Sequence, residues 1–340
     1  MRIVVDAMGS DNHPAPDVAG AVMAAREYGL EIVLVGDQAL IKPQLAQEDT
    51  VGLQIDVVHT AEFISMSDHP VEAARAKKNS SMYLGTNLVK AGEADAFVTA
   101  GNTGGLLAVT TLHTLRRIPG VLRPALTVLF HMRGHCSLLA DIGANVDCKP
   151  EWLQQFALMA AIYAERGLGV QNPRVALLSN GEEEIKGNEL TKKAATLIRR
   201  VGLNYIGHVE PKEVLLTDKA DVVVHDGFVG NILTKTYGAT AELMFALIKE
   251  EAEKSLRVGV GLQIAKPGLR SVKHRIDPME FGGAALLGGN GVGISAHGRS
   301  NALGIKSAIH QARDAVRGDV IAAVRAGMAR WATLPEATEV

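Results

Sequence analysis

Short apolar runs alternate with amphipathic stretches along most of the chain. Continuous apolar runs rich in β-branched residues, at residues 3–5, 32–35 and 222–224, are typical of strands that are buried on both faces of a sheet. Stretches with apolar positions at helical spacing, such as residues 17–28 and 80–91, lie between runs of this kind. Because strands separated by helices predict parallel βαβ units, we expect an α/β fold with a mostly parallel sheet and helices on both faces.

The stretch from residue 96 to residue 115 contains no Asp, Glu, Lys or Arg. It is long enough to cross a bilayer, but a Gly-Asn-Thr-Gly-Gly cluster at residues 101–105 interrupts the apolar run near its start. We therefore predict a buried strand, a glycine loop and a helix here rather than a transmembrane helix.

The chain shows no fixed-period repeat and no linker, so we expect one α/β domain over residues 1–335, with two lobes around a cleft. A composition shift comes late. The helical stretch 237–251 leads into residues 254–276, which carry no acidic residue and six basic ones: Lys254, Arg257, Lys266, Arg270, Lys273 and Arg275. Alternating apolar residues accompany them. We predict a basic, apolar helical projection at about residues 237–276, which either contacts a partner or packs at a dimer interface.

Charge and cysteine content exclude several classes of protein. The 340 residues carry 35 Lys and Arg against 37 Asp and Glu, a net charge of −2. This near-neutral balance argues against a nucleic-acid binder. Two cysteines exclude a disulfide framework and a four-cysteine zinc site. We interpret Cys136 and Cys148 as small buried thiols.

Polar, glycine-rich segments follow five of the expected strands. Ligands of parallel α/β sheets bind beyond the carboxyl ends of the strands, so we expect these segments to line one cleft. Each of them alone is also explained by turn chemistry, because Gly and Asn tolerate positive φ. The segments are residues 6–11, 100–105, 141–145, 180–189 and 225–231.

The chemistry of these segments suits an oxyanion. A Gly-Asn-Thr-Gly sequence that opens a helix offers free backbone N–H groups, a hydroxyl and the positive end of the helix dipole, which suits phosphate. Lys186 adds a cation, or else pairs with the neighbouring Glu184 or Glu189. Ser80 either caps a helix or joins the site. His297 follows a strand-like run, and is either a packed residue or a catalyst.

Several standard motifs are absent from the sequence. There is no P-loop, no G-x-G-x-x-G after the first strand, no G-x-S-x-G elbow and no H-E-x-x-H. A dinucleotide site, a hydrolase triad and a metal site are therefore unsupported. We expect no cofactor and no metal.

The ordered set of motifs resembles the PlsX family, the acyl-acyl-carrier-protein:phosphate acyltransferases, over nearly the whole chain. The chain departs from the usual family pattern at Ser10, Asn12, Gly105 and Arg299. The matching motifs include Val5-Asp6-Ala7-Met8-Gly9, Lys77-Lys78-Asn79-Ser80-Ser81-Met82, Ala100-Gly101-Asn102-Thr103-Gly104, Arg123-Pro124-Ala125-Leu126, Asp141-Ile142-Gly143-Ala144-Asn145, Lys186-Gly187-Asn188-Glu189, Ala220-Asp221-Val222-Val223-Val224, Asp226-Gly227-Phe228-Val229-Gly230-Asn231, Gly282-Gly283-Ala284 and Ala296-His297-Gly298.

The resemblance implies a three-layer α/β/α fold related to phosphotransacetylases and isocitrate/isopropylmalate dehydrogenases. It implies transfer of a long-chain acyl group from the thioester of acyl carrier protein to inorganic phosphate, which gives acyl phosphate for phospholipid synthesis. The implied partners are acyl carrier protein, phosphate, a second copy of the chain, the membrane surface and a downstream glycerol-phosphate acyltransferase. The implied location is cytoplasmic and peripheral to the membrane, with no nucleic acid bound.

We hypothesise roles for the residues of these motifs in a direct attack of phosphate on the thioester. The candidate catalytic groups are Lys186, Asn188, Asn231 and His297. The candidate phosphate-binding group is Gly101, Asn102, Thr103 and Gly104. The candidate supporting residues are Asp6, Gly9, Asp11, Ser80, Asp141, Asn145, Asp226 and Gly227. The basic stretch is expected to contact the carrier protein or the membrane.

Three alternatives remain. A phosphotransacetylase that uses a short acyl-CoA would share the fold and the chemistry but not the carrier. A decarboxylating dehydrogenase of the same fold would need dinucleotide and metal signatures. A non-catalytic phosphate- or acyl-binding module would bind without turnover.

Overall fold

The computed structural model describes residues 1–132, 134–276 and 282–333. Within these residues eleven strands form one sheet, in the order β3-β2-β1-β4-β11-β10-β5-β6-β9-β7-β8. The strands are β1 (Arg2–Asp6), β2 (Glu31–Gly36), β3 (Ile55–His59), β4 (Ala96–Thr99), β5 (Ala125–Met132), β6 (His135–Ala140), β7 (Val175–Leu178), β8 (Tyr205–Val209), β9 (Val222–Val224), β10 (Ala284–Leu287) and β11 (Val292–Ser295).

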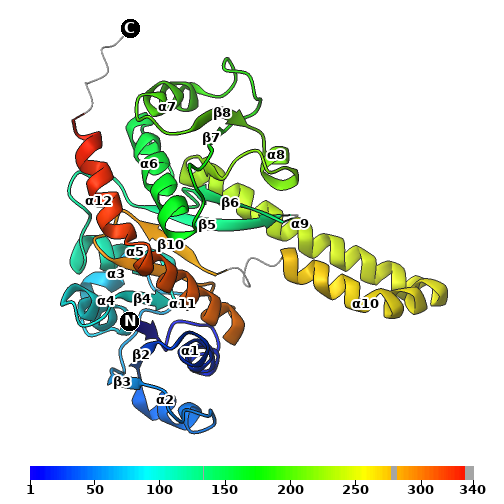
Figure 1. Ribbon diagram of the computed structural model, residues 1–340. Helices are drawn as coiled ribbons and strands as arrows, with labels where there is room; N and C mark the ends of the chain where they lie inside the picture. The colour runs from blue at the N-terminus through cyan, green and yellow to red at the C-terminus, as the bar shows by residue number, and fades with distance from the viewer. Residues whose placement is uncertain (133, 277–281, 334–340) are drawn as a thin grey trace.

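Helices cover both faces of the sheet (Figure 1). The helices are α1 (Ala15–Tyr28), α2 (Gln38–Leu45), α3 (Pro70–Ala76), α4 (Ser81–Lys90), α5 (Thr103–Ala108), the π-helical η1 (Val109–His113), α6 (Pro150–Gly167), α7 (Glu189–Arg199), α8 (Pro211–Leu216), α9 (Gly227–Lys254), α10 (Leu256–Ile276), α11 (Ala302–Arg317) and α12 (Val320–Trp331). The predicted α/β fold with a mostly parallel sheet is confirmed. The predicted strand, glycine loop and helix over residues 96–115 are confirmed as β4, α5 and η1.

Neighbouring side chains of the strands point into different cores, as the continuous apolar runs require. Ile3 and Val5 of β1 belong to the large core under α1, α6, α11 and α12, whereas Val4 lies in a second core with Met82 and Leu106. A third core lies on β6, β7 and β9 around Leu139 and Val223. The result is the three-layer arrangement.

The two ends of the sheet run in opposite directions. The first block, β3-β2-β1-β4-β11, is parallel throughout, and the second block, β6-β9-β7-β8, is parallel throughout. Between the blocks lie β10 and β5, and the pairs β11–β10, β10–β5 and β5–β6 are all antiparallel. Three reversals turn the second block against the first, so the carboxyl ends of the two blocks lie at opposite ends of the sheet.

Helices α9 and α10 leave the body side by side and form the long projection in Figure 1. The helix expected over residues 237–251 lies within α9, which begins earlier, at Gly227. Beyond its first turns α9 buries no side chain, and Leu243, Met244, Leu256 and Ile264 are exposed. Among the described helices, none is long and apolar enough to cross a bilayer.

Candidate functional site

The carboxyl ends of β1, β4 and β11 form what we call the first edge. The backbone N–H of Asp11 donates to the carbonyl oxygen of Gly298 at 2.8 Å. The hydroxyl groups of Thr103 and Ser295 lie 3.1 Å apart, although 192 positions separate them in the chain. Gly9 lies so close to Gly101 that a Cβ on Gly9 would sit 2.7 Å from the Gly101 nitrogen. Loops from both ends of the chain therefore meet here.

Asp6, the last residue of β1, connects two of these loops through buried hydrogen bonds. Its carboxylate is fully buried, accepts the Thr99 hydroxyl at 2.8 Å and accepts the Met8 N–H at 3.1 Å. The Thr99 hydroxyl oxygen accepts the Gly101 N–H at 2.9 Å in turn. Burial raises the pKa of Asp6 above its usual value. Its place beneath the loops suits the supporting role that the sequence suggested.

Asn102 caps the helix rather than facing a ligand. Its Oδ1 accepts the Gly105 N–H at 2.9 Å, and its Nδ2 donates to the carbonyl oxygens of Ser65 and Asp68. The backbone N–H groups of Thr103 and Gly104 have no hydrogen-bond partner within the described part of the chain. These two N–H groups and the Thr103 hydroxyl are the donors that remain for an anion.

Two further expected residues lie at the first edge. Ser80 precedes α4, and its hydroxyl is fully buried without a hydrogen-bond partner among the described residues. Such a group costs about 1–3 kcal/mol unless water or a ligand satisfies it. His297 is exposed, and its Nδ1 accepts the Arg299 N–H at 3.2 Å. With Nδ1 acting as acceptor, a neutral His297 carries its proton on Nε2.

The carboxyl ends of β6, β9 and β7 form the second edge, where Asp141 is the central group. Its Oδ1 accepts the N–H groups of Leu126, Gly143 and Ala144 at 2.9–3.2 Å. Its Oδ2 accepts both the backbone N–H and the side-chain amide of Asn145, at 2.7 and 2.9 Å. The carboxylate is fully buried. It therefore holds the loop together and has no acceptor capacity left for a ligand.

Other expected residues at the second edge are caps and spacers. Asp226 accepts the Val229 N–H at 2.8 Å and caps α9, and Asn188 accepts the Thr191 N–H at 2.9 Å and caps α7. A Cβ on Gly227 would lie 2.5 Å from the carbonyl oxygen of Asn145. These contacts explain the residue types by local structure alone.

Lys186 and Asn231 keep polar atoms available at the second edge. Lys186 is exposed and makes no ion pair within the described residues, because Glu184 pairs with Arg199 and Glu189 pairs with Lys193. The interpretation of Lys186 as an ion-paired surface lysine is therefore wrong. The Asn231 amide donates to the carbonyl oxygen of Ile142 at 3.2 Å, and its Oδ1 remains open.

The expectation that all five segments line one cleft of a single chain is wrong. The first edge brings together residues 6–11, 100–105 and His297, whereas residues 141–145, 180–189 and 225–231 lie at the second edge. The physical reason is the reversal of strand direction across β10 and β5, because it sends the carboxyl ends of the two blocks to opposite ends of the sheet. Ser80 precedes α4, whose Met82 side chain lies against Gly101 of the first edge.

Comparison with known proteins identifies the family to which the chain belongs. The model of the family described as "Fatty acid synthesis protein" matches residues 1–323. A phosphate acyltransferase of Pelotomaculum thermopropionicum is 44% identical over 328 residues, which is 96% of this chain and 95% of the relative. The phosphate acyltransferase of Geobacter sulfurreducens is 43% identical over 320 residues, 94% of this chain and 92% of the relative. The chain belongs to the phosphate acyltransferase family. The resemblance inferred from the motifs is confirmed.

Solved structures of other proteins share the fold of this member of the phosphate acyltransferase family. A phosphotransacetylase from Streptococcus pyogenes superposes with a TM-score of 0.61 at 17% identity, covering 93% of this chain and 94% of that one. The EutD phosphotransacetylase from Staphylococcus aureus superposes with a TM-score of 0.58 at 18% identity, covering 92% and 94%. At these identities the likeness shows the fold alone.

Ser295 is a site residue that the motif analysis missed. It is buried at the end of β11, and its hydroxyl faces Thr103. Its position as the last residue of an expected strand was the available signal, since residues 292–295 read as strand-like. The motif analysis instead predicted the site residue two positions later, at His297.

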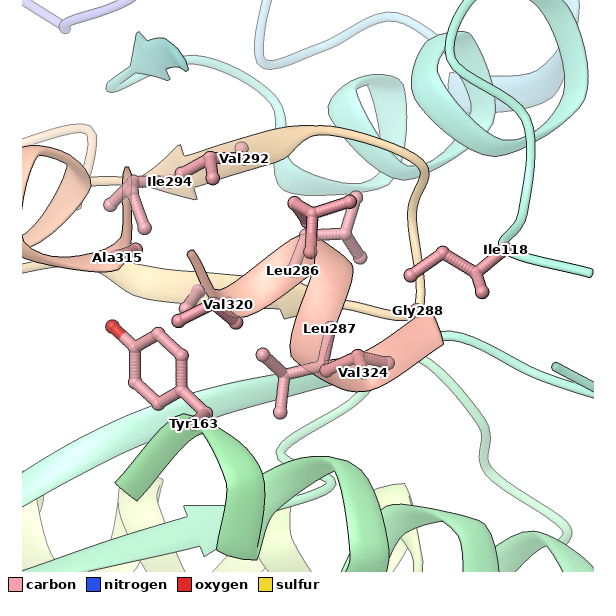
Figure 2. Close-up of a pocket in the computed structure, with 13 residues that line it drawn as sticks. Ile118, Tyr163, Leu286, Leu287, Gly288, Val292, Ile294, Ala315, Val320 and Val324 are labelled. Carbon is pink, nitrogen blue, oxygen red and sulfur yellow. The ribbon is translucent and has the colours of Figure 1, made fainter. Parts of the chain in front are cut away.

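Two cavities of the described chain are lined by residues outside both edges. One is a cavity of about 10 Å³ in the core. Figure 2 shows the apolar side chains that line it, such as Leu286, Leu287 and Val324, with the ring of Tyr163 beside them. A surface groove of about 730 Å³ runs between α6, α12 and residues 201–204. Neither is lined by the open donors of the first edge.

The thiols and the potential metal ligands of the chain bear on which chemistry the site can use. Burial raises the pKa of both Cys136 and Cys148 to about 12, so both thiols are protonated near neutral pH. Within residues 1–132, 134–276 and 282–333, no three His, Cys, Asp or Glu side chains come together as a metal-ligand set.

The basic residues of the projection are placed in part. Arg257, Lys266 and Arg270 lie on α10 and are exposed, and Lys254 at the end of α9 pairs with Glu251 at 2.7 Å. Lys273 and Arg275 belong to α10, but their side chains lie outside the described residues.

Proposed function

We propose that the chain transfers a long-chain acyl group from the thioester of acyl carrier protein to inorganic phosphate, and that the acyl phosphate enters phospholipid synthesis. Membership of the phosphate acyltransferase family supports the reaction class. The observation that carries the assignment to the first edge is the set of unsatisfied donors on Thr103 and Gly104, next to the Ser295 hydroxyl. The positive end of the helix that begins at Thr103 favours a bound dianion.

Phosphate is the nucleophile in this proposal. A phosphate oxygen attacks the thioester carbonyl carbon and forms a C–O bond, which gives a tetrahedral oxyanion. The oxyanion collapses, the C–S bond breaks, and the thiolate of the carrier protein leaves with the electron pair and then takes a proton. Holding phosphate and thioester together removes much of the entropic barrier. Donors such as the Nε2–H of His297 would stabilise the oxyanion or the thiolate.

Direct attack needs no covalent enzyme intermediate. The protonated, half-buried thiols of Cys136 and Cys148 are poor nucleophiles, because the thiolate is the reactive form. Asp6 supports the loops rather than the phosphate, since a second negative charge beside phosphate would repel it.

Lys186, Asn188 and Asn231 enter the proposal through a homodimer. Within one chain the second edge lies away from the Thr103 loop, so Lys186 cannot join the same phosphate. A second copy that brings its second edge to the first edge of its partner would place the unpaired Lys186 ammonium near the reacting groups. Asn188 keeps only its amide nitrogen for such a role, because its Oδ1 already caps α7.

The projection formed by α9 and α10 is proposed as the contact for acyl carrier protein or for an anionic membrane surface. Its exposed apolar residues and its cations Arg257, Lys266 and Arg270, which pair with no acidic group among the described residues, fit an acidic protein or a negatively charged lipid surface. Contact with the membrane would place the enzyme as a cytoplasmic, peripherally bound protein that passes acyl phosphate to a glycerol-phosphate acyltransferase.

One assay tests the proposed function. Purified protein is mixed with palmitoyl-acyl carrier protein and inorganic phosphate, release of the carrier thiol is followed, and hydroxylamine traps acyl phosphate as the hydroxamate. We expect phosphate-dependent thiol release together with hydroxamate. A parallel arm with acetyl-CoA tests the second candidate, which the phosphotransacetylase neighbours favour. Turnover of acetyl-CoA with no reaction of the carrier thioester would overturn the proposal and establish a phosphotransacetylase. Tight phosphate binding without turnover of either donor would indicate a binding module.

A further inference from the structure

We propose that Asp17 is a positioning residue of the first edge, which sets the loop of residues 7–13 through its buried hydrogen bond to Ser10. This inference rests on the proposed use of the first edge for phosphate. Asp17 touches no substrate in the proposal. It acts through Ser10 on the two contacts by which the loop joins the rest of the site.

The hydrogen bond between Asp17 and Ser10 is short and fully buried. Ser10 Oγ lies 2.5 Å from Asp17 Oδ2, and both residues are at most 2% exposed. The other carboxyl oxygen, Oδ1, is buried without a hydrogen-bond partner among the described residues. A carboxyl group with one such oxygen is better accommodated as the neutral acid than as the carboxylate.

Ser10 stands between the two residues that connect its loop to the other loops. Gly9 lies against Gly101, and the Asp11 N–H donates to the carbonyl oxygen of Gly298. The carbonyl oxygen of Ser10 is also 2.7 Å from the Nδ1 of His13. A shift of Ser10 therefore moves the loop against the Gly101–Thr103 segment and against the His297 loop together.

The hydrogen bond from Ser10 to Asp17, which we call the anchor, depends on the Ser10 hydroxyl. The chain departs from the usual family pattern at Ser10, so the anchor belongs to this chain's own side chains. Ser10→Ala and Ser10→Gly variants each remove the hydroxyl and with it the anchor.

The electrostatic surroundings make the anchor sensitive to pH. The pKa of Asp17 is raised to about 7, chiefly by burial and also by the negative charge of Asp6 on β1, while the Ser10 hydrogen bond lowers it. His13, in the same loop, lowers the pKa of Asp6 and is the nearby cation when protonated. On α11, which packs against α1, Lys306 is paired with Glu27. Ionisation would leave a carboxylate with an unsatisfied oxygen next to Asp6.

The sign of the effect follows from linkage. A carboxyl whose pKa is higher in the folded chain than the usual 3.8 stabilises the fold while it is protonated. This contribution is full below about pH 4, declines as pH rises, and is lost above about pH 7. The loop is therefore expected to be best anchored on the acidic side of pH 7 and to loosen as Asp17 ionises.

The test compares the wild type with Asp17→Asn, Ser10→Ala and Ser10→Gly between pH 6 and pH 9. The amide of the Asp17→Asn variant keeps the shape of the side chain and a hydrogen-bonding partner for Ser10, but it does not titrate. Every comparison is made at the same pH, because inorganic phosphate also titrates in this range. We expect the wild-type KM for phosphate, relative to Asp17→Asn, to rise several-fold from pH 6 to pH 8.5 while kcat changes little. Ser10→Ala and Ser10→Gly should show the high KM at every pH.

The pH dependence of thermal stability is measured in parallel, without substrate. Loss of stability from pH 5 to pH 7 that Asp17→Asn does not share supports the protonated anchor. Identical stability profiles and identical KM profiles for the wild type and Asp17→Asn would overturn the inference. Profiles that differ in stability but not in KM would also overturn it, because Asp17 would then be structural only. If no protein turns over, the proposed function fails, and the phosphate concentration that protects each variant against unfolding replaces KM as the readout.

Discussion

The first and second edges are built from the same kinds of residue and differ in how far their polar atoms are satisfied. Both follow buried strands, and both combine glycine with Asp or Asn. At the second edge Asp141 accepts hydrogen bonds from four residues, and Asp226 and Asn188 cap helices. At the first edge Ser80 and Asp17 keep buried polar atoms without partners, and the N–H groups of Thr103 and Gly104 stay open within the described chain. The second edge is not fully satisfied either, because the buried Nε2 of His225 lacks a partner among the described residues. The contrast therefore lies between Asp141 with its caps, which hold structure together, and the open donors around Thr103, which are prepared to bind.

The contrast also separates stability from function in physical terms. A buried polar atom without a partner is destabilising by about 1–3 kcal/mol. Among the described residues, Ser80, Ser81 and Asp17 hold such atoms near the first edge, and His225 holds one at the second edge. The second edge, by comparison, gains from hydrogen bonds to a charged acceptor, which are worth about 1.5–3 kcal/mol each before desolvation is counted. Substitution of Asp141 or of the helix caps at the second edge should therefore act on folding, and substitution of the open donors at the first edge should act on turnover.

Asp141→Ala should have the largest effect and should act on folding. The substitution leaves the buried N–H of Leu126 and the part-buried N–H groups of Gly143 and Ala144 without their acceptor, and frees Asn145. We expect a loss of about 3–5 kcal/mol in the free energy of unfolding, measured by urea denaturation. Asp226→Ala removes a single cap and serves as the control, with an expected loss of about 1 kcal/mol. Equal losses for the two variants would contradict the central role of Asp141.

Thr103→Val should have the next largest effect and should act on turnover. The isosteric change removes a hydroxyl donor from the first edge and keeps the volume of the side chain. We expect kcat/KM for phosphate to fall by about 10²-fold or more, with an unchanged midpoint of urea denaturation. Thr110→Val is the matched control, because the Thr110 hydroxyl donates only to backbone carbonyl oxygens of its own helix. A Thr103→Val enzyme with wild-type kcat/KM would remove phosphate from the first edge.

The sequence predicted where strands and helices lie, but it did not predict the direction in which each strand runs in the sheet. Apolar runs identified β1, β2, β4 and β9, and the Gly-Asn-Thr-Gly cluster identified the start of α5. The strands that reverse the sheet, β5 and β10, lie in stretches whose local pattern says nothing about direction. A pattern of residues shows that a strand is buried, but its direction depends on which strand it pairs with, here β5 with β6 and β10.

The roles of the site residues were limited by the same difficulty. Asp6 and Asp141 look alike in sequence, since each ends a strand and precedes a glycine. Asp141 is fully satisfied because the N–H of Leu126, fifteen positions earlier, reaches its carboxylate. The Thr103–Ser295 contact spans 192 positions. Contacts of this kind follow from topology and not from spacing. Motif analysis therefore finds the residue types but does not separate the residues that hold loops in place from those that bind a ligand.

Lys186→Ala is expected to have an intermediate effect and tests whether the two edges act together. If a second copy brings Lys186 to the first edge of its partner, its loss should lower kcat by about 10- to 100-fold with the fold retained. Lys193→Ala is the control, because Lys193 already pairs with Glu189 on the surface of α7. Its effect should be within about 0.5 kcal/mol in stability and negligible in turnover.

Mixed dimers of two variants test directly whether the second edge of one chain acts with the first edge of its partner. Lys186→Ala and Thr103→Val chains are each impaired, but a mixed dimer of the proposed kind holds one site with both residues intact. After the two variants are unfolded together and refolded, activity should exceed the sum of the separate variants. Activity equal to that sum would show that the second edge contributes nothing to a partner's first edge, and would leave Lys186 with a role at its own edge.

The smallest expected effect concerns the projection, which belongs to neither edge. The combined substitutions Arg257→Gln, Lys266→Gln and Arg270→Gln remove exposed cations that pair with no acidic group in the described chain. Near an anionic bilayer each basic residue contributes about 1 kcal/mol, so binding to vesicles that contain anionic lipid should weaken markedly, and the loss should shrink as salt rises. If the cations instead face the acidic carrier protein, KM for the acyl carrier rises and vesicle binding stays. Lys254→Gln should do little in either assay, because Glu251 already neutralises Lys254. Unchanged vesicle binding and unchanged KM would make the projection a structural element of the dimer, and the first edge would then have to select its acyl donor without help from α10.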